Sequence, residues 1–275
     1  MKNVLEDSFS FGLIPYWELQ SFLFAGTRIS TFMASSMLAL VVGGYATLWL
    51  AKSRQSREMR EVLPMLAFTI IFGYIGAHVL HVIGYEAFES VSMTASRLGQ
   101  VQSGLSSIGG LMGGGLGALL HARLAGRRGA LNLDVLALGA AAGLVPGRLG
   151  CFLVHDHPGR ASEFFMAVSY PGGARHDLGL YEACVAALVV IGLLRIAARF
   201  KRPGIIAAGF CLLYCLPRFA LDFLRVRGEE AQALVAEGLI RVGHVDITHA
   251  GLTAGQWVCL LALAGSVLWC KRGLR

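Results

Sequence analysis

Charged residues are the main shortage of this chain, because they make up only 15% of its 275 residues. Hydrophobic residues make up 55%, and the mean hydropathy is +0.62. These values exclude an ordinary soluble domain and indicate a polytopic membrane protein. The six cysteines contain no CxxC pair, so neither a disulfide framework nor a CxxC metal site is indicated. Residues 1–12 include acidic side chains, and no long apolar core follows a basic start, so we expect no cleavable signal peptide.

Apolar stretches that approach the roughly 20 residues needed to cross a bilayer as a helix recur along the chain. There are seven of them, at residues 30–51, 62–83, 105–120, 133–153, 178–198, 204–224 and 252–270. The third is short and rich in glycine, which weakens an isolated helix but permits close approach to its neighbours. Its glycines are not followed by the Lys-Ser or Lys-Thr of a phosphate-binding loop, so they indicate helix packing. The sequence predicts an all-α, seven-span helical bundle.

The basic residues predict the orientation of this bundle. Alternate connections and the C-terminal tail carry 14 of the 24 Lys and Arg residues, and short cytoplasmic loops accumulate such residues. We therefore expect a cytoplasmic C-terminus and an outward N-terminus. Residues 1–29 then form an outward interfacial segment, and residues 30–275 form a transmembrane domain with outward loops 154–177 and 225–250. Topology thus explains the net charge of +7 without a nucleic-acid partner.

Arg148 and Arg218 each lie at the end of a long apolar stretch. A charge near the bilayer centre costs at least about 2.5 to 3.5 kcal/mol, so such residues usually face a polar cavity. One interpretation is an anion site. The alternative is a buried ion pair with Asp156 or Asp222 that fixes helix packing.

Histidines are grouped at two places in the chain. His155 and His157 flank Asp156 at the predicted outer surface, where they form either a catalytic group or a solvated loop cluster. His78 and His81 share one face of the second predicted span, and they either look into a cavity or are satisfied core residues. These five residues have suitable types for a metal site, but no recognised spacing joins the two groups, so we predict no metal.

Several short motifs follow one another in a fixed order. They are Gly109-Gly110-Leu111, Gly147-Arg148-Leu149-Gly150-Cys151-Phe152 with Asp156 and Gly159-Arg160, Arg175-His176 with Leu180-Tyr181-Glu182, Arg218-Phe219 with Asp222-Phe223 and Arg225, and Leu252 to Gln256. This order resembles that of the phosphatidylglycerol:prolipoprotein diacylglyceryl transferases. The matches extend over nearly the whole chain.

The resemblance implies a multi-pass protein of the bacterial inner membrane that acts in lipoprotein biosynthesis. It implies transfer of a diacylglyceryl group from phosphatidylglycerol to a prolipoprotein cysteine or a different nucleophile, with no cofactor. Arg148 and Arg218 would hold the lipid phosphate, since guanidinium groups can grip two oxygens at once. It implies that Gly159 leaves room for the lipid headgroup. The other substrate-binding residues that it implies are Arg160, Arg225, His176, Tyr181 and Glu182.

The chain departs from the family pattern mainly where the acceptor would be activated. Ile108 stands in place of the family's His, Cys151 in place of Asn, Phe32 in place of Tyr, His78 in place of Arg, and Asp156 and Asp222 in place of Glu. A thiol or hydroxyl nucleophile needs a base within hydrogen-bond reach, which Ile108 cannot supply. We expect Asp156 with His155 or His157 to supply it, and Asp222 to orient Arg218. The secondary candidates are His78, His81 and Cys151, the last of which is either a nucleophile or a small buried residue.

Two other functional classes fit the same sequence. A lipid-binding or partner-regulating protein that has lost catalysis would keep the arginines, whereas a metal-dependent lipid-modifying enzyme would depend on the histidines. The loop at residues 225–249 contains a helix-compatible stretch at 231–240. This stretch is either a platform for the acceptor or a short surface helix.

Overall fold

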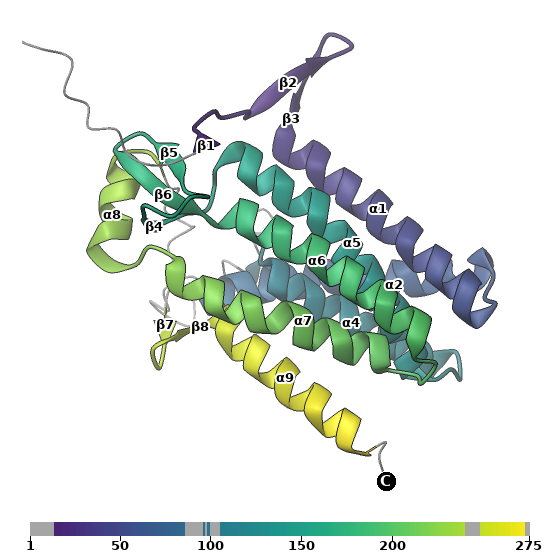
Figure 1. Cartoon of the computed structure of the whole chain (residues 1–275). Helices are drawn as coiled ribbons and strands as arrows, with labels where there is room; N and C mark the ends of the chain where they lie inside the picture. Colours follow the sequence, from purple (N-terminus) through teal and green to yellow (C-terminus); the bar gives the residue numbers. More distant parts are fainter. Residues whose placement is uncertain (1–13, 86–95, 97, 100–104, 240–247, 273–275) are drawn as a thin grey trace, which may run out of the picture.

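The computed structural model describes residues 14–85, 96, 98–99, 105–239 and 248–272 of the chain. Long helices lie side by side, and short strands and one short helix gather at one end of them (Figure 1). The helices are α1 (Thr31–Gln55), α2 (Met59–Tyr85), α4 (Ser107–Leu124), α5 (Gly129–Val154), α6 (Leu178–Arg199), α7 (Ile205–Leu221), α8 (Gly228–Ala236) and α9 (Ala254–Arg272), and a 3₁₀ turn, η1 (Asp222–Leu224), follows α7.

Six of the described helices are long and apolar enough to cross a membrane, namely α1, α2, α5, α6, α7 with η1, and α9. The chain is therefore a multi-pass membrane protein. In the described part of the chain, six of the seven predicted spans meet these criteria. The remaining predicted span corresponds to α4, which has 18 residues. Its many glycines add little apolar surface, and its last turn carries His121 and Arg123.

The glycines of α4 pack its backbone against α2. A Cβ atom placed on Gly76 of α2 would lie 2.5 Å from the carbonyl oxygen of Gly109, and one placed on Gly117 would lie 2.5 Å from that of Phe68. Such close approach of two backbones requires a glycine on at least one side of each contact. The prediction that the glycines serve tight helix packing is confirmed.

A small four-stranded sheet in the order β1-β5-β6-β4 covers one end of the bundle. It comprises β1 (Ile14–Pro15), β4 (Pro158–Ala161), β5 (Val168–Tyr170) and β6 (Gly173–Asp177), and two hairpins stand beside it, β2 (Ser21–Phe24) with β3 (Thr27–Ser30) and β7 (Thr248–His249) with β8 (Leu252–Thr253). The prediction of an all-α protein is therefore wrong for the connecting segments. Strands of two to five residues are too short to show alternating hydrophobicity, and they depend on turn glycines such as Gly172 (φ +86°).

The helix predicted at 231–240 is present as α8, and a small apolar group of Val226, Ala231 and Leu234 anchors it. It lies at the same end of the bundle as the sheet, whereas α9 ends at the opposite end (Figure 1). This arrangement places both predicted outward loops on one side. Residues 1–13 of the predicted N-terminal segment and 240–247 of the second loop lie outside the described residues.

A buried carboxylate links α5 to the start of α7. Asp134 accepts hydrogen bonds from the backbone N–H groups of Gly204 (2.7 Å), Ile206 (2.9 Å) and Ala207 (2.9 Å). The first N–H groups of a helix have no partner within the helix, and the helix dipole favours a negative charge there. Asp134 therefore fixes the position of α7 along α5.

Candidate functional site

A buried group of charged residues joins α5, α6 and α7. Arg148 Nε lies 2.9 Å from Glu182 Oε2, and Arg218 Nε lies 3.6 Å from the same oxygen. The exposed fractions are 5% for Arg148, 4% for Arg218 and 1% for Glu182. The structure thus brings together two predicted phosphate-binding arginines around a carboxylate that the sequence also marked.

Asp222 and Arg225, in and after η1, extend this group. Asp222 Oδ1 pairs with Arg218 and lies 2.7 Å from Arg225 Nε, and Asp222 Oδ2 accepts a hydrogen bond of 2.7 Å from Thr253 Oγ1. Arg225 Nη2 lies 3.6 Å from Glu182 Oε1. We call Arg148, Glu182, Arg218, Asp222 and Arg225 the arginine cluster. The predicted pairing of Arg218 with Asp222 is present, whereas Arg148 pairs with Glu182 and not with Asp156.

The arginine cluster holds more positive than negative charge. Three arginines face two carboxylates, which leaves a net charge of +1. Both oxygens of Glu182 and the Nε of Arg218 are buried without a well-directed hydrogen bond, although they take part in these ion pairs. Buried polar atoms of this kind are costly and rare in native proteins. The net positive charge and the donor Nε of Arg218 therefore suit the cluster to receive an anion, whereas the Glu182 oxygens can only accept hydrogen bonds.

Tyr214 is a member of this site that the sequence analysis missed. Its side chain is 2% exposed, and it interacts electrostatically with Arg148, Glu182 and Arg218. Its hydroxyl has no hydrogen-bond partner among the residues that the structure describes. The available signal was its position four residues before Arg218, which places both side chains on one face of α7. The hydroxyl can donate to an anion held by the arginines.

Cys151, Asp156 and His157 come together where α5 ends. His157 Nε2 lies 3.7 Å from Asp156 Oδ1, and the potential metal-ligating atoms of all three side chains lie within 4.8 Å of one another. Cys151 lies three residues after Arg148 on α5, so the two side chains share one face of the helix and interact electrostatically. This group therefore borders the arginine cluster.

His155 does not join its neighbours at the surface, so that part of the prediction is wrong. Its side chain is 4% exposed, with Nδ1 2.7 Å from Asp177 Oδ2 and Nε2 3.0 Å from the Trp17 carbonyl oxygen. Its left-handed backbone (φ +48°) turns the side chain away from that of Asp156 and into the sheet. Tyr170 donates to Asp177 at 2.6 Å, and burial together with this carboxylate raises the pKa of Tyr170. His155 thus ties the end of α5 to β6 and to the N-terminal segment.

The histidines of α2 lie in other surroundings. His78 is 5% exposed, and its Nε2 lies 3.1 Å from the carbonyl oxygen of Leu98. His81 is partly buried. In the described part of the chain, neither belongs to the group of potential metal ligands at Cys151. His78 is thus a buried packing residue whose Nε2 has a partner, whereas its Nδ1 has none among the described residues.

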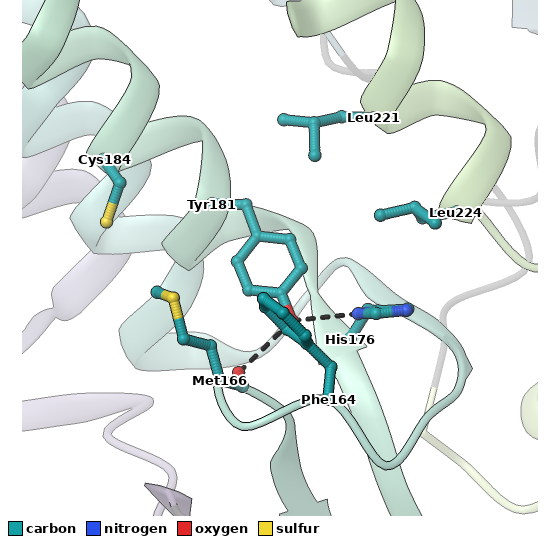
Figure 2. Close-up of a pocket in the computed structure, with 7 residues that line it drawn as sticks. All are labelled: Phe164, Met166, His176, Tyr181, Cys184, Leu221 and Leu224. Atoms are coloured by element: carbon teal, nitrogen blue, oxygen red, sulfur yellow. Dashed lines mark hydrogen bonds between the residues drawn. The ribbon is translucent and has the colours of Figure 1, made fainter.

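An apolar pocket of about 410 Å³ lies beside the arginine cluster, between α6, the end of α7 and the loop of the sheet. Figure 2 shows its lining, which consists of Phe164, Met166, His176, Tyr181, Cys184, Leu221 and Leu224. His176 Nδ1 lies 2.9 Å from the Tyr181 hydroxyl, and burial lowers the pKa of His176, which favours a neutral ring. Arg148 and Arg218 do not line this pocket, but Tyr181 directly precedes Glu182 in the chain.

Gly159 leaves room for the chain's own backbone. A Cβ atom at this position would lie 2.8 Å from the carbonyl oxygen of Leu224 and 2.9 Å from the Cβ of His176. Gly159 also forms a β-bridge with Arg225. The expected role of making space for a headgroup is thus replaced by the support of Arg225. Arg160, the next residue, is exposed.

Gly159→Ala is expected to destabilise the protein by about 1 to 3 kcal/mol, because the added methyl group pushes β4 away from Leu224 and Arg225. Thermal unfolding in detergent measures this effect. Gly44→Ala is the matched control, since nothing lies within 4 Å of a Cβ atom there. An equal midpoint for both variants would contradict the packing role of Gly159.

Comparison with known proteins gives one consistent result. The family model described as prolipoprotein diacylglyceryl transferase matches residues 21–271. The phosphatidylglycerol–prolipoprotein diacylglyceryl transferase of Chromohalobacter salexigens is 29% identical over 80% of this chain and 86% of its own length. The enzyme of the same name from Azotobacter vinelandii is 28% identical over 94% of this chain and 97% of its own length. Because the family model covers most of the chain, this protein belongs to the prolipoprotein diacylglyceryl transferase family.

Proposed function

We propose that this protein transfers the diacylglyceryl group of phosphatidylglycerol to the cysteine of a prolipoprotein. The observation that carries the proposal is the arginine cluster, which is buried and has a net charge of +1. The relatives are named for this reaction, and the cluster contains the residues that the shared motifs mark.

The charge of the cluster matches that of the donor lipid. A phosphodiester such as that of phosphatidylglycerol carries one negative charge, which would neutralise the excess charge of +1 on the cluster. As the carbon–oxygen bond to the phosphate breaks, the departing glycerol phosphate gains a second negative charge. Positioned donors in a low-dielectric site stabilise such developing charge. Arg148 and Arg218 supply two of these donors, and the Tyr214 hydroxyl supplies a third.

The acceptor thiol needs a base near the phosphate site. Ile108, at the position of the family's His, is a buried aliphatic residue. Asp156 and His157 are half-buried, and they lie beside Cys151, which follows Arg148 by one turn of α5. We assign acceptor activation to this pair. The apolar pocket at Tyr181 then takes either the apolar residues of the precursor peptide or an acyl chain of the lipid.

We further propose that this chemistry takes place at the outer face of a bacterial inner membrane. In this orientation, the N-terminus lies outside and the C-terminus is cytoplasmic. The helix α4 then crosses the membrane as a seventh span, covered by α2 and α5. The β2–β3 hairpin carries the exposed apolar side chains of Leu23 (74%) and Phe24 (66%), as expected for an interfacial segment.

The test uses the full-length protein in phosphatidylglycerol vesicles with a peptide that carries a lipoprotein cleavage-site cysteine. We expect a diacylglyceryl thioether on the peptide, detected by mass, and an equal amount of released glycerol phosphate. Phosphatidylcholine vesicles are the control and should give no product. If phosphatidylglycerol is consumed with a different thiol or hydroxyl acceptor but not with the peptide, the protein is a transferase whose acceptor is not the prolipoprotein cysteine. Binding of the lipid without turnover for any acceptor would favour the lipid-binding alternative.

A further inference from the structure

Cys151, Asp156 and His157 combine three different ligand types at the outward end of α5. One sulfur, one carboxylate oxygen and one ring nitrogen lie within 4.8 Å of one another. Cys151 is buried and the other two residues are half-buried, so the group faces the outside only in part. Within the described ranges this is the group of three such residues that lie close enough to hold one ion.

The backbone at the end of α5 builds this group. The N–H of His155 donates to the Phe152 carbonyl (3.2 Å), and the N–H of Asp156 donates to the Cys151 carbonyl (3.4 Å). This pair of hydrogen bonds, with a left-handed residue between the helix and Asp156, is the Schellman ending of a helix. It folds Asp156 and His157 back over the last turn, where Cys151 lies.

We propose that Cys151, Asp156 and His157 bind a Zn²⁺ ion. Zinc is held at about 2.3 Å by thiolate sulfur and at about 2.0 to 2.2 Å by imidazole nitrogen and carboxylate oxygen. Two ligand atoms of one ion can therefore lie up to about 4 Å apart. The ligand atoms of the three side chains lie within 4.8 Å of one another, so side-chain rotations that move these atoms by less than about 1 Å bring them to this distance. Three protein ligands leave a fourth position of the tetrahedron open, as in catalytic zinc sites.

The electrostatics of the site favour a divalent cation. The last carbonyl groups of α5 carry the negative end of the helix dipole, which attracts a cation. The ion itself displaces the proton of the Cys151 thiol, because a thiol that coordinates a metal ion is deprotonated. A thiolate and a carboxylate together balance the two charges of Zn²⁺. The ion therefore leaves the net charge of +1 on the arginine cluster unchanged, and metal and phosphate can be bound together.

The open coordination position of the ion can bind the acceptor thiol, a role that rests on the proposed function. The acceptor thiol releases its proton to solvent and binds the ion as a thiolate. The sulfur then forms its bond to the glyceryl carbon while the carbon–oxygen bond to the phosphate breaks, and glycerol phosphate leaves with that electron pair. The ion, with Asp156 and His157 among its ligands, thus replaces these two side chains as the group that activates the acceptor, in a chain that has Ile108 at the position of the family's His.

The test measures metal binding without substrate, so its result does not depend on the transferase proposal. The full-length protein in detergent is stripped with a chelator and titrated with Co²⁺, whose bond to sulfur gives an absorption band. We expect one ion per chain, displaced by one Zn²⁺ as counted by elemental mass spectrometry. Cys151→Ser should remove the sulfur band, and His157→Ala should weaken Zn²⁺ binding on the order of 100-fold or more.

Matched variants control for folding and for chance binding by the same residue types. Cys270→Ser and His249→Ala remove a cysteine and a histidine at other places and should keep the band and the stoichiometry. Cys151→Asn introduces the residue of the family pattern and should also lose the band while it keeps the fold, as judged by thermal unfolding. Binding of less than one ion per chain, or an unchanged band in Cys151→Ser, would overturn the proposal. If metal binding is present but turnover is absent, only the proposed function is lost.

Discussion

Arg148→Ala is expected to lower the rate of diacylglyceryl transfer by at least about 10² to 10³, the effect of removing one donor from a preorganised site for a developing negative charge. The loss should lie in turnover more than in folding. Glu182, which pairs with Arg148 at 2.9 Å, keeps Arg218 and Arg225 as partners at 3.6 Å each. Initial rates in phosphatidylglycerol vesicles, normalised to folded protein, measure the effect.

Two variants make this result specific. Arg148→Lys keeps the positive charge but not the planar pair of donors, so it should recover only a small part of the rate. Arg57→Ala removes another buried arginine, which contacts Asn132 (2.8 Å) and Glu61 outside the site. This control should reduce stability without changing turnover per folded molecule. Wild-type turnover in Arg148→Ala would show that the arginine cluster does not bind the donor lipid.

The largest expected effect on stability is that of Gly113→Ala, at the contact of α2 and α4. The added Cβ atom would overlap the carbonyl oxygen of Phe72, and a backbone atom cannot rotate away as a side chain can. The two helices must therefore separate along their glycine contacts. We expect a loss of about 3 kcal/mol, the upper end for an overpacked contact. Unfolding by denaturing detergent, followed by tryptophan fluorescence, measures this loss.

Gly115→Ala is the matched control on the same helix. The nearest atom to a Cβ at this position is Leu133 Cδ2, at 3.9 Å, which is an ordinary contact. This variant should be as stable as the parent or slightly more so, because alanine is the better helix former. If both variants unfold at the same detergent concentration, the close glycine contact does not hold α4 in place.

The sequence predicted the membrane helices well, because hydrocarbon requires long apolar segments and their composition is visible in the chain. The helix predicted for the third apolar stretch is present as α4, but its glycines supply helix packing instead of apolar surface, so its role as a seventh span stays a prediction. The sequence failed for the small sheet, whose strands of two to five residues depend on distant partners.

The sequence correctly marked most of the residues of the site, but it did not predict which of them contact one another. Arg148, Arg218 and Glu182 were all marked, but the partner of Arg148 was expected to be Asp156 or Asp222. The pairing of residues on different helices depends on how each helix is rotated, which hydropathy does not record. The direction of the His155 side chain depends on one left-handed backbone residue at the end of α5, and no motif in the chain announces it. Tyr214 was missed because it belongs to none of the motifs, although it lies four residues before Arg218 on the same face of α7.

The bond network of Asp134 at the opposite end of the bundle sets the relative height of the two arginines. Arg148 lies 14 residues beyond Asp134, and Arg218 lies 14 residues beyond Gly204, which Asp134 binds. At about 1.5 Å per helical residue, both guanidinium groups stand about 21 Å above the same carboxylate. The hydrogen bonds of Asp134 near one end of the bundle thus hold the two arginines of the cluster level with each other near its other end.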